Sequence, residues 1–132
     1  LVNEERAKRN IAPLIWDTNL ANIARSHSND MLERNYYSHV NPEGLDATGR
    51  TQIADYDCFK DYGSHYYDGV AENLLRYPYS LWRINSLSVD VMQMWMDEDG
   101  HAGNILESEY ERIGIGVATG LGLELYLTQN FC

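Results

Sequence analysis

Basic side chains are scarce in this sequence. Twenty Asp and Glu residues outnumber ten Lys and Arg residues, which leaves a formal net charge of −10 over 132 residues. A surface of this charge repels phosphate backbones and anionic lipids, so no nucleic acid or membrane surface is expected as a partner. The same field favours cations and basic partners.

Long apolar runs are missing as well. No stretch of about eighteen apolar residues occurs, so we expect no membrane span. No apolar leader opens the sequence, because Glu4 and Glu5 interrupt its first residues. A leader removed on export would leave such a start, so its absence is compatible with a secreted protein.

Cysteine is limited to Cys58 and Cys132. The pair lacks the Cys-x-x-Cys spacing of zinc and redox sites and is too small for a disulfide-rich scaffold. The two residues are either free thiols or one long-range bridge. The bridge is favoured, because a free Cys132 would leave the end of the chain to fray.

The chain shows no internal repeat and no low-complexity tract, so residues 1–132 are expected to form a single domain. Helices are predicted over residues 3–10, from the N-cap Thr18 to about Asn35, more weakly over 50–56, and over 86–97. In the second helix an apolar stripe recurs at three- and four-residue spacing, formed by Leu20, Ile23, Ala24, His27 and Met31. The last helix is expected to bury Leu87, Val91, Met94 and Trp95.

Alternating residues mark two strands near the end of the chain. Ile113, Ile115 and Val117 alternate with glycines, and a second series alternates with polar residues, formed by Leu123, Leu125 and Leu127. The glycines at 120 and 122 predict a hairpin between them. The fold class is therefore α+β, with helices packed on an antiparallel sheet.

Motifs of several enzyme classes are absent. The sequence has no His-Glu-x-x-His helix, no Walker loop, no Gly-x-Gly-x-x-Gly, no EF-hand loop and no Gly-x-Ser-x-Gly elbow. Three histidines directly follow a serine, but adjacent side chains point apart on a strand and lie about 100° apart on a helix. They form no nucleophile–base pair, which excludes a serine hydrolase.

The four histidines differ in their surroundings. His27 lies on the apolar stripe and is expected to be a core residue bonded to backbone, whereas His65 is expected on the surface. His39 stands in a loop rich in turn-forming residues. His101 follows Glu98 by three residues, so the two share a face and could converge on a cation if the helix is continuous there.

Glu72 interrupts the apolar run 70–75. Because an unpaired buried charge is costly, this carboxylate is either exposed or buried with a partner.

Five ordered segments, which together cover nearly the whole chain, carry a family resemblance. They are NEERAKRNIAPLIWDTNLANIARSHSNDM, YYSHVNPEG, VAENLL, SVDVMQMWMDEDGHAGNIL, and RIGIGVA followed by YLTQNF. Together they resemble the CAP superfamily of cysteine-rich secretory proteins, antigen 5 and pathogenesis-related proteins, also called SCP domains, in its prokaryotic form.

The resemblance implies a three-layer α-β-α sandwich with a central antiparallel sheet and a central cleft. Onto that cleft it maps four residues, His39, Glu72, Glu98 and His101. Tyr126 stands where many family members have their second histidine, so His101 would take its place. Two imidazole ligands that leave other coordination positions of the ion open favour Zn²⁺ or a similar divalent metal over Mg²⁺. The two glutamates either ligate or orient the imidazoles, with Asn73 and the Ser38 hydroxyl as supporting donors.

Three functions remain open. The preferred one is a secreted, extracellular or cell-surface binding module that holds a divalent metal or small ligand. Its partner would be a protein, a glycan or a small molecule, and the aromatic segment 77–82 is a candidate surface for that partner. The second is a metal-dependent hydrolase, such as a peptidase, with His39 and His101 as ligands and Glu72 or Glu98 as general base. The third is a structural network of the same residues without metal.

Overall fold

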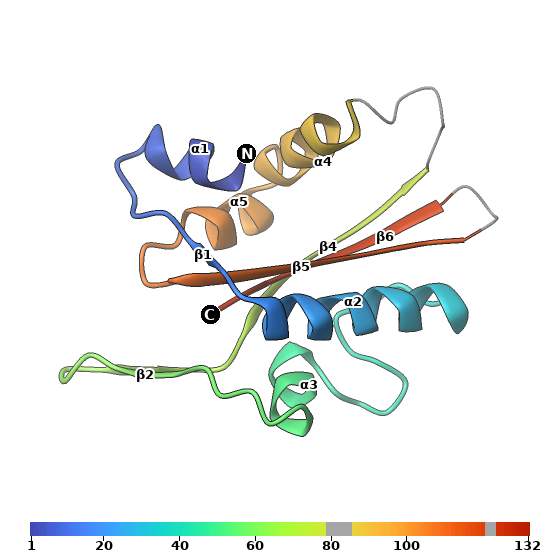
Figure 1. The fold of residues 1–132 in the computed structure, drawn as a ribbon, viewed down its shortest axis with the longest axis horizontal. Coiled ribbons are helices and arrows are strands. Elements are labelled where there is room, and N and C mark those ends of the chain that lie inside the picture. Colours follow the sequence, from blue (N-terminus) through green and yellow to red (C-terminus); the bar gives the residue numbers. More distant parts are fainter. Residues whose placement is uncertain (79–85, 121–123) are drawn as a thin grey trace.

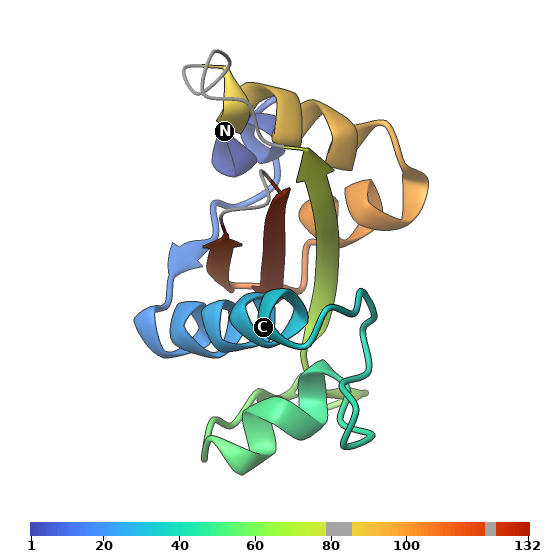
Figure 2. The same ribbon diagram turned by 90° about the vertical axis from the view of Figure 1, so that its right-hand side faces the viewer.

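The computed structural model describes residues 1–78, 86–120 and 124–132. A four-stranded sheet lies between two helical layers (Figures 1 and 2). One face carries α2 (Thr18–Glu33), with α3 (Ala47–Ile53) beside it; the other carries α1 (Val2–Ala7), α4 (Leu87–Met96) and α5 (Asp99–Leu106). The predicted α+β class and the α-β-α sandwich are confirmed.

The sheet has the strand order β1-β5-β6-β4. Its strands are β1 (Ile15–Trp16), β5 (Arg112–Thr119), β6 (Glu124–Phe131) and β4 (Ala71–Pro78). The β5–β6 and β6–β4 pairs are antiparallel, and the predicted terminal strands pair with each other, Val117 opposite Leu127. The short strand β1, which runs parallel to β5, was not predicted. The expected hairpin residues 122 and 123 lie outside the described part of the chain.

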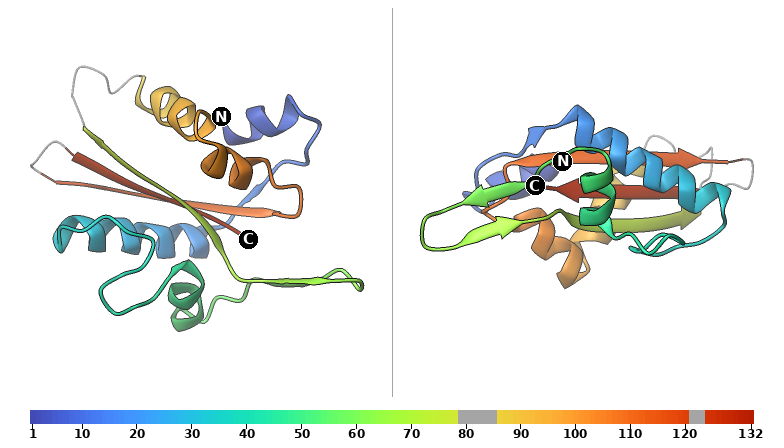
Figure 3. Two further views of the ribbon diagram at one scale, coloured as in Figure 1. Left: turned by 180° about the vertical axis from the view of Figure 1, so that it is seen from behind. Right: turned by 90° about the horizontal axis from the view of Figure 1, so that it is seen from below.

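A second, two-stranded sheet projects from the body of the molecule (Figure 3). It pairs β2 (Phe59–Asp61) with β3 (Tyr66–Asp68). The sequence did not predict it, because both strands are only three residues long.

The N-cap of α2 lies one residue earlier than predicted. Asp17, not Thr18, is the N-cap, and its carboxylate accepts hydrogen bonds from the backbone N–H groups of Asn19 and Leu20. The predicted apolar stripe is buried as expected, at Leu20, Ile23, Ala24, His27 and Met31.

Two glycines of β5 bring α2 directly onto the sheet. A Cβ atom at Gly114 would collide with the backbone of Ala21, and one at Gly116 with the backbone of Arg25. The glycines therefore let the helix backbone lie against the strand, which is a close approach that no side chain permits.

Other helix predictions need correction. Met94 of α4 is 37% exposed, while Met92 is buried in its place. The weak helix expected over 50–56 lies at 47–53, because the Asp46 carboxylate caps it by accepting from the N–H of Gly49. The helix predicted over 86–97 is α4, which ends at Met96; Glu98 has extended backbone as the N-cap of α5, a separate helix that was not predicted.

Cys58 and Cys132 form the long-range disulfide that was favoured. It joins the segment before β2 to the end of β6. Within the described ranges, no helix is long and apolar enough to cross a membrane.

Candidate functional site

Glu72 is the centre of the site and lies near the start of the edge strand β4. Its side chain is only 3% exposed, and Arg50 of α3 binds its Oε2 as an ion pair. Its Oε1 lies 2.9 Å from Nδ1 of His39. Of the two possibilities open from the sequence, the structure therefore shows a carboxylate buried with a partner.

Arg50 also holds the loop that carries His39. One guanidinium nitrogen donates to the carbonyl of His39 at 2.8 Å and to that of Leu45 at 3.0 Å. The sequence analysis did not identify Arg50. The only available signal was the requirement of a buried Glu72 for a cation, and that requirement does not say which basic residue supplies it.

His101 approaches the same strand from the opposite layer. Successive strand residues point to opposite faces, so Glu72 meets α3 whereas Asn73 meets α5. The Asn73 side chain donates to the carbonyl of His101 at 3.0 Å and accepts from Asn104 at 2.8 Å. Nδ1 of His101 lies 2.9 Å from the Glu98 carboxylate, so these two residues meet even though the helix is interrupted. Asn73 thus holds the backbone of the segment that carries His101, and its role as a supporting donor of a metal site stays a prediction.

Three other predictions concern Ser38, His27 and His65. The Ser38 hydroxyl accepts a hydrogen bond from the N–H of Val40, and its role as a supporting donor stays a prediction. His27 is a buried core residue, as expected, and its Nε2 lies 3.0 Å from the carbonyl of Ser38 and 4.0 Å from Glu72. His65 is on the surface, as expected, and pairs with Glu109.

The pKa values of the two candidate ligand histidines shift in opposite directions. The hydrogen bond to Glu72 raises the pKa of His39 despite partial burial and the charge of Arg50. Burial lowers the pKa of His101, Glu98 opposes that effect, and the charge of His39 lowers it further. Burial likewise lowers the pKa of His27.

His39 and His101 are the two candidate nitrogen ligands of a metal at this site. Over residues 1–78, 86–120 and 124–132, no three His, Cys, Asp or Glu side chains gather as a metal-binding group. In both His39 and His101, however, Nδ1 is held by a carboxylate, so Nε2 is the nitrogen left for a ligand. Such a pair leaves the other coordination positions of an ion to water or to a bound group.

A family comparison covers nearly the whole chain. Residues 1–131 match the model of the cysteine-rich secretory protein family, CAP. The chain belongs to the CAP family. The predicted resemblance is therefore confirmed over nearly the whole chain.

Two relatives come from Bacillus subtilis (strain 168). The uncharacterized membrane protein YlbC is 31% identical over 131 residues, which are 99% of this chain and 32% of that protein. The uncharacterized protein YkwD is 31% identical over 116 residues, 88% of this chain and 39% of that protein. The CAP chain thus spans between about a third and two fifths of these relatives.

Solved structures share the fold. An extracellular protein containing an SCP domain from Bacillus anthracis str. Ames superposes with a TM-score of 0.77 at 28% identity, over 98% of this chain and 37% of that one. An outer surface protein from Borrelia burgdorferi gives a TM-score of 0.72 at 19% identity, over 98% and 85% of the two chains, and shows the fold alone.

Proposed function

We propose that this CAP chain is an extracellular or cell-surface binding module in which His39 and His101 hold a divalent cation through Nε2. One observation carries the proposal: Glu72 and Glu98 each lie 2.9 Å from Nδ1 of one of these histidines. Metal-bound imidazoles in proteins almost always donate their other N–H to a carboxylate or carbonyl, which fixes the tautomer and the ring orientation. The two glutamates would act in this way, as orienting groups and not as ligands.

The chemistry of the site favours a transition ion. Two neutral imidazoles suit Zn²⁺ or a similar ion better than Mg²⁺, which prefers oxygen ligands. The net charge of −10 raises the local concentration of cations. When bound, the ion supplies open positions that attract a donor atom of a protein, glycan or small-molecule ligand.

The proposed location draws on the relatives. One similar structure belongs to a protein described as extracellular, and a curated relative is named a membrane protein. Both names support a position outside the cell or at its surface, and the disulfide between Cys58 and Cys132 suits an oxidising compartment.

The test is a calorimetric titration of Zn²⁺ into chelator-treated protein near pH 7.5. We expect saturable one-to-one binding in the wild type and none in the double variant His39→Ala/His101→Ala. The matched control is His65→Ala, since this surface histidine also pairs with a glutamate, at 2.9 Å, and is expected to leave the binding unchanged.

Two results would contradict the proposal. Equal heats in the wild type and the double variant would remove the metal site. A double variant that loses several kcal/mol of stability in the absence of metal would instead identify the cluster as a structural network, because buried partners would then have lost their hydrogen bonds.

The hydrolase alternative has less support. Glu72 is nearly buried and both of its oxygens are engaged, by His39 and by Arg50. A general base needs an oxygen within reach of the attacking water, so this carboxylate is poorly placed for the role.

A further inference from the structure

The sheet has an open edge on the side opposite to the histidines. The short strand β1 pairs with β5 only at Arg112 and Ile113, after which the N–H of Asp17 bonds to the carbonyl of Ile113. From there to the end of β5, the structure describes no strand on that side.

The backbone groups at this edge point outward. Arg112 and Cys132 exchange both hydrogen bonds, so in an antiparallel ladder every second residue of β5 bonds to β6. Ile115 and Val117 lie between those residues, and their N–H and C=O groups therefore face away from β6. No backbone partner for these groups occurs among the described residues.

The side chains at the edge leave it unprotected. Natural proteins block open edges with charged residues, proline or a covering element. Here the residues whose N–H and C=O groups face outward are Ile115 and Val117, which are β-branched and apolar. Val117 is 43% exposed. Such an edge is a ready template for another extended chain.

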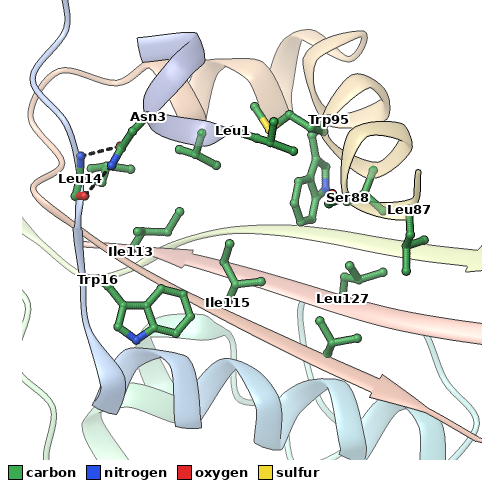
Figure 4. A pocket seen from close by; sticks show the side chains of 14 residues that line it. Leu1, Asn3, Leu14, Trp16, Leu87, Ser88, Trp95, Ile113, Ile115 and Leu127 are labelled. Atoms are coloured by element: carbon green, nitrogen blue, oxygen red, sulfur yellow. Dashed lines mark hydrogen bonds between the residues drawn. The ribbon is translucent and has the colours of Figure 1, made fainter. Parts of the chain in front are cut away.

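An apolar pocket of about 570 Å³ lies directly beside this edge, between β5 and the helices α1 and α4 (Figure 4). Its wall includes Trp16, Val91, Trp95, Ile115, Val117 and Leu127, and none of its lining side chains is charged. In a strand paired to β5, every second side chain would lie on this face of the sheet, next to Ile115 and Val117.

One polar atom in the pocket wall lacks a partner. Trp95 is 3% exposed, and its indole Nε1 makes no hydrogen bond within the described structure. A buried donor of this kind is costly unless an acceptor reaches it. Because Nε1 has almost no accessible surface, a bound molecule reaches it only if the pocket wall shifts.

We propose that this edge binds an extended segment of a partner protein, which adds to β5 as a further strand and inserts alternate apolar side chains into the pocket. A polypeptide backbone supplies alternating donors and acceptors at the spacing that Ile115 and Val117 present. A fatty acid would find no charged side chain in the pocket wall to pair with its carboxylate. The net charge of −10 favours a segment flanked by Lys or Arg.

The test uses a phage-displayed library of random dodecapeptides, selected on the immobilised protein. Enriched sequences are synthesised with blocked ends and titrated calorimetrically. We expect apolar residues at alternate positions, and protection of the Ile115 and Val117 amides from hydrogen exchange when the peptide is bound.

Matched variants separate backbone pairing from simple apolar contact. Val117→Pro removes an outward N–H that takes no part in the β6 ladder and should weaken binding about tenfold, the effect of one hydrogen bond. Val117→Thr keeps that N–H and should bind normally. Ser88→Trp fills the pocket and should abolish binding, whereas Ser88→Ala should not; Ser88 is an exposed lining residue.

A peptide-side variant covers the case in which Val117→Pro fails to fold. N-methylation of alternate peptide amides removes the donors that would face β5 and should weaken binding to the wild type. The proposal is overturned if no sequence is enriched over the Ser88→Trp protein, or if N-methylation has no effect on affinity. It is also overturned if dodecanoate fills the pocket and the peptides do not compete with it. His39→Ala/His101→Ala should bind the peptides normally, so this test does not depend on the metal site.

Discussion

Arg50 and Glu72 form an ion pair that joins α3 to the edge strand β4, with side chains only 9% and 3% exposed. The same guanidinium bonds to the loop carbonyl of His39. One buried interaction thus positions both the carboxylate and the loop of the candidate site, so the site depends on α3 being in place.

Arg50→Ala is expected to destabilise the protein by about 3–5 kcal/mol, because it leaves the Glu72 carboxylate buried without its cation. Urea unfolding at neutral pH measures the loss. The control is Arg34→Ala, which removes a surface arginine that pairs with Asp30 and Glu43 and should cost less than about 1 kcal/mol. Equal losses in the two variants would contradict a special role for the buried pair.

Glu98→Gln should weaken Zn²⁺ binding by about 10- to 100-fold while leaving the free energy of unfolding nearly unchanged. The Glu98 side chain is 67% exposed and contacts Nδ1 of His101, so its removal affects the orientation of the imidazole more than the packing. Glu109→Gln is the matched control, since it alters an exposed glutamate that pairs with His65. Calorimetric titration of both variants is the measurement, and a normal affinity in Glu98→Gln would contradict the orienting role.

Gly116→Ala should strongly destabilise the fold, because its new Cβ would meet the backbone of Arg25 in α2. The contrasting change is Gly103→Ala in α5, where the Cβ would meet nothing. That second change should stabilise the protein by about 0.5–1 kcal/mol, since alanine is the better helix former. Thermal unfolding of both variants checks the prediction, which fails if Gly116→Ala melts at the wild-type temperature.

The sequence was informative where a pattern spans many residues. The apolar stripe of α2 and the alternation in β5 and β6 both recur over several turns or pairs, and both were predicted. Short elements carry no such period, which explains why β1 and the β2–β3 hairpin were missed. The separate helix α5 was missed for a related reason, since local composition does not reveal the extended backbone of Glu98 that divides it from α4.

The candidate site was predictable only in part. Its four residues came from local patterns and a family resemblance, and the structure shows which of them make contact: His39 with Glu72, and His101 with Glu98. Arg50 was out of reach because it joins Glu72 across 22 positions of sequence, and such pairings depend on how α3 packs against β4. The sequence shows that a buried Glu72 needs a cation, but the tertiary structure decides which residue supplies it.

The carboxylate of Asp17, the N-cap of α2, should make the stability of the protein depend on pH in the acid range. Burial acts to raise the pKa of Asp17, but hydrogen bonds from the Leu20 N–H, the Tyr56 hydroxyl and the Asn19 N–H, together with the charge of Arg112, outweigh it and lower that pKa. A lowered carboxyl pKa contributes stability that is fully present above the unfolded-state value of about 3.9 and is lost as the pH falls through the folded-state value.

Asp17→Asn isolates this contribution, because asparagine still caps the helix but does not titrate there. The wild type should be the more stable protein above about pH 5, and its advantage should shrink as the pH falls below about 4. Urea unfolding at a series of pH values measures the difference. Tyr56→Phe removes one of the hydrogen bonds that lower the folded-state pKa, so the pH-dependent loss of stability should be smaller than in the wild type and complete at a higher pH. Parallel curves for wild type and Asp17→Asn would show that the ionised carboxylate contributes nothing beyond the cap itself.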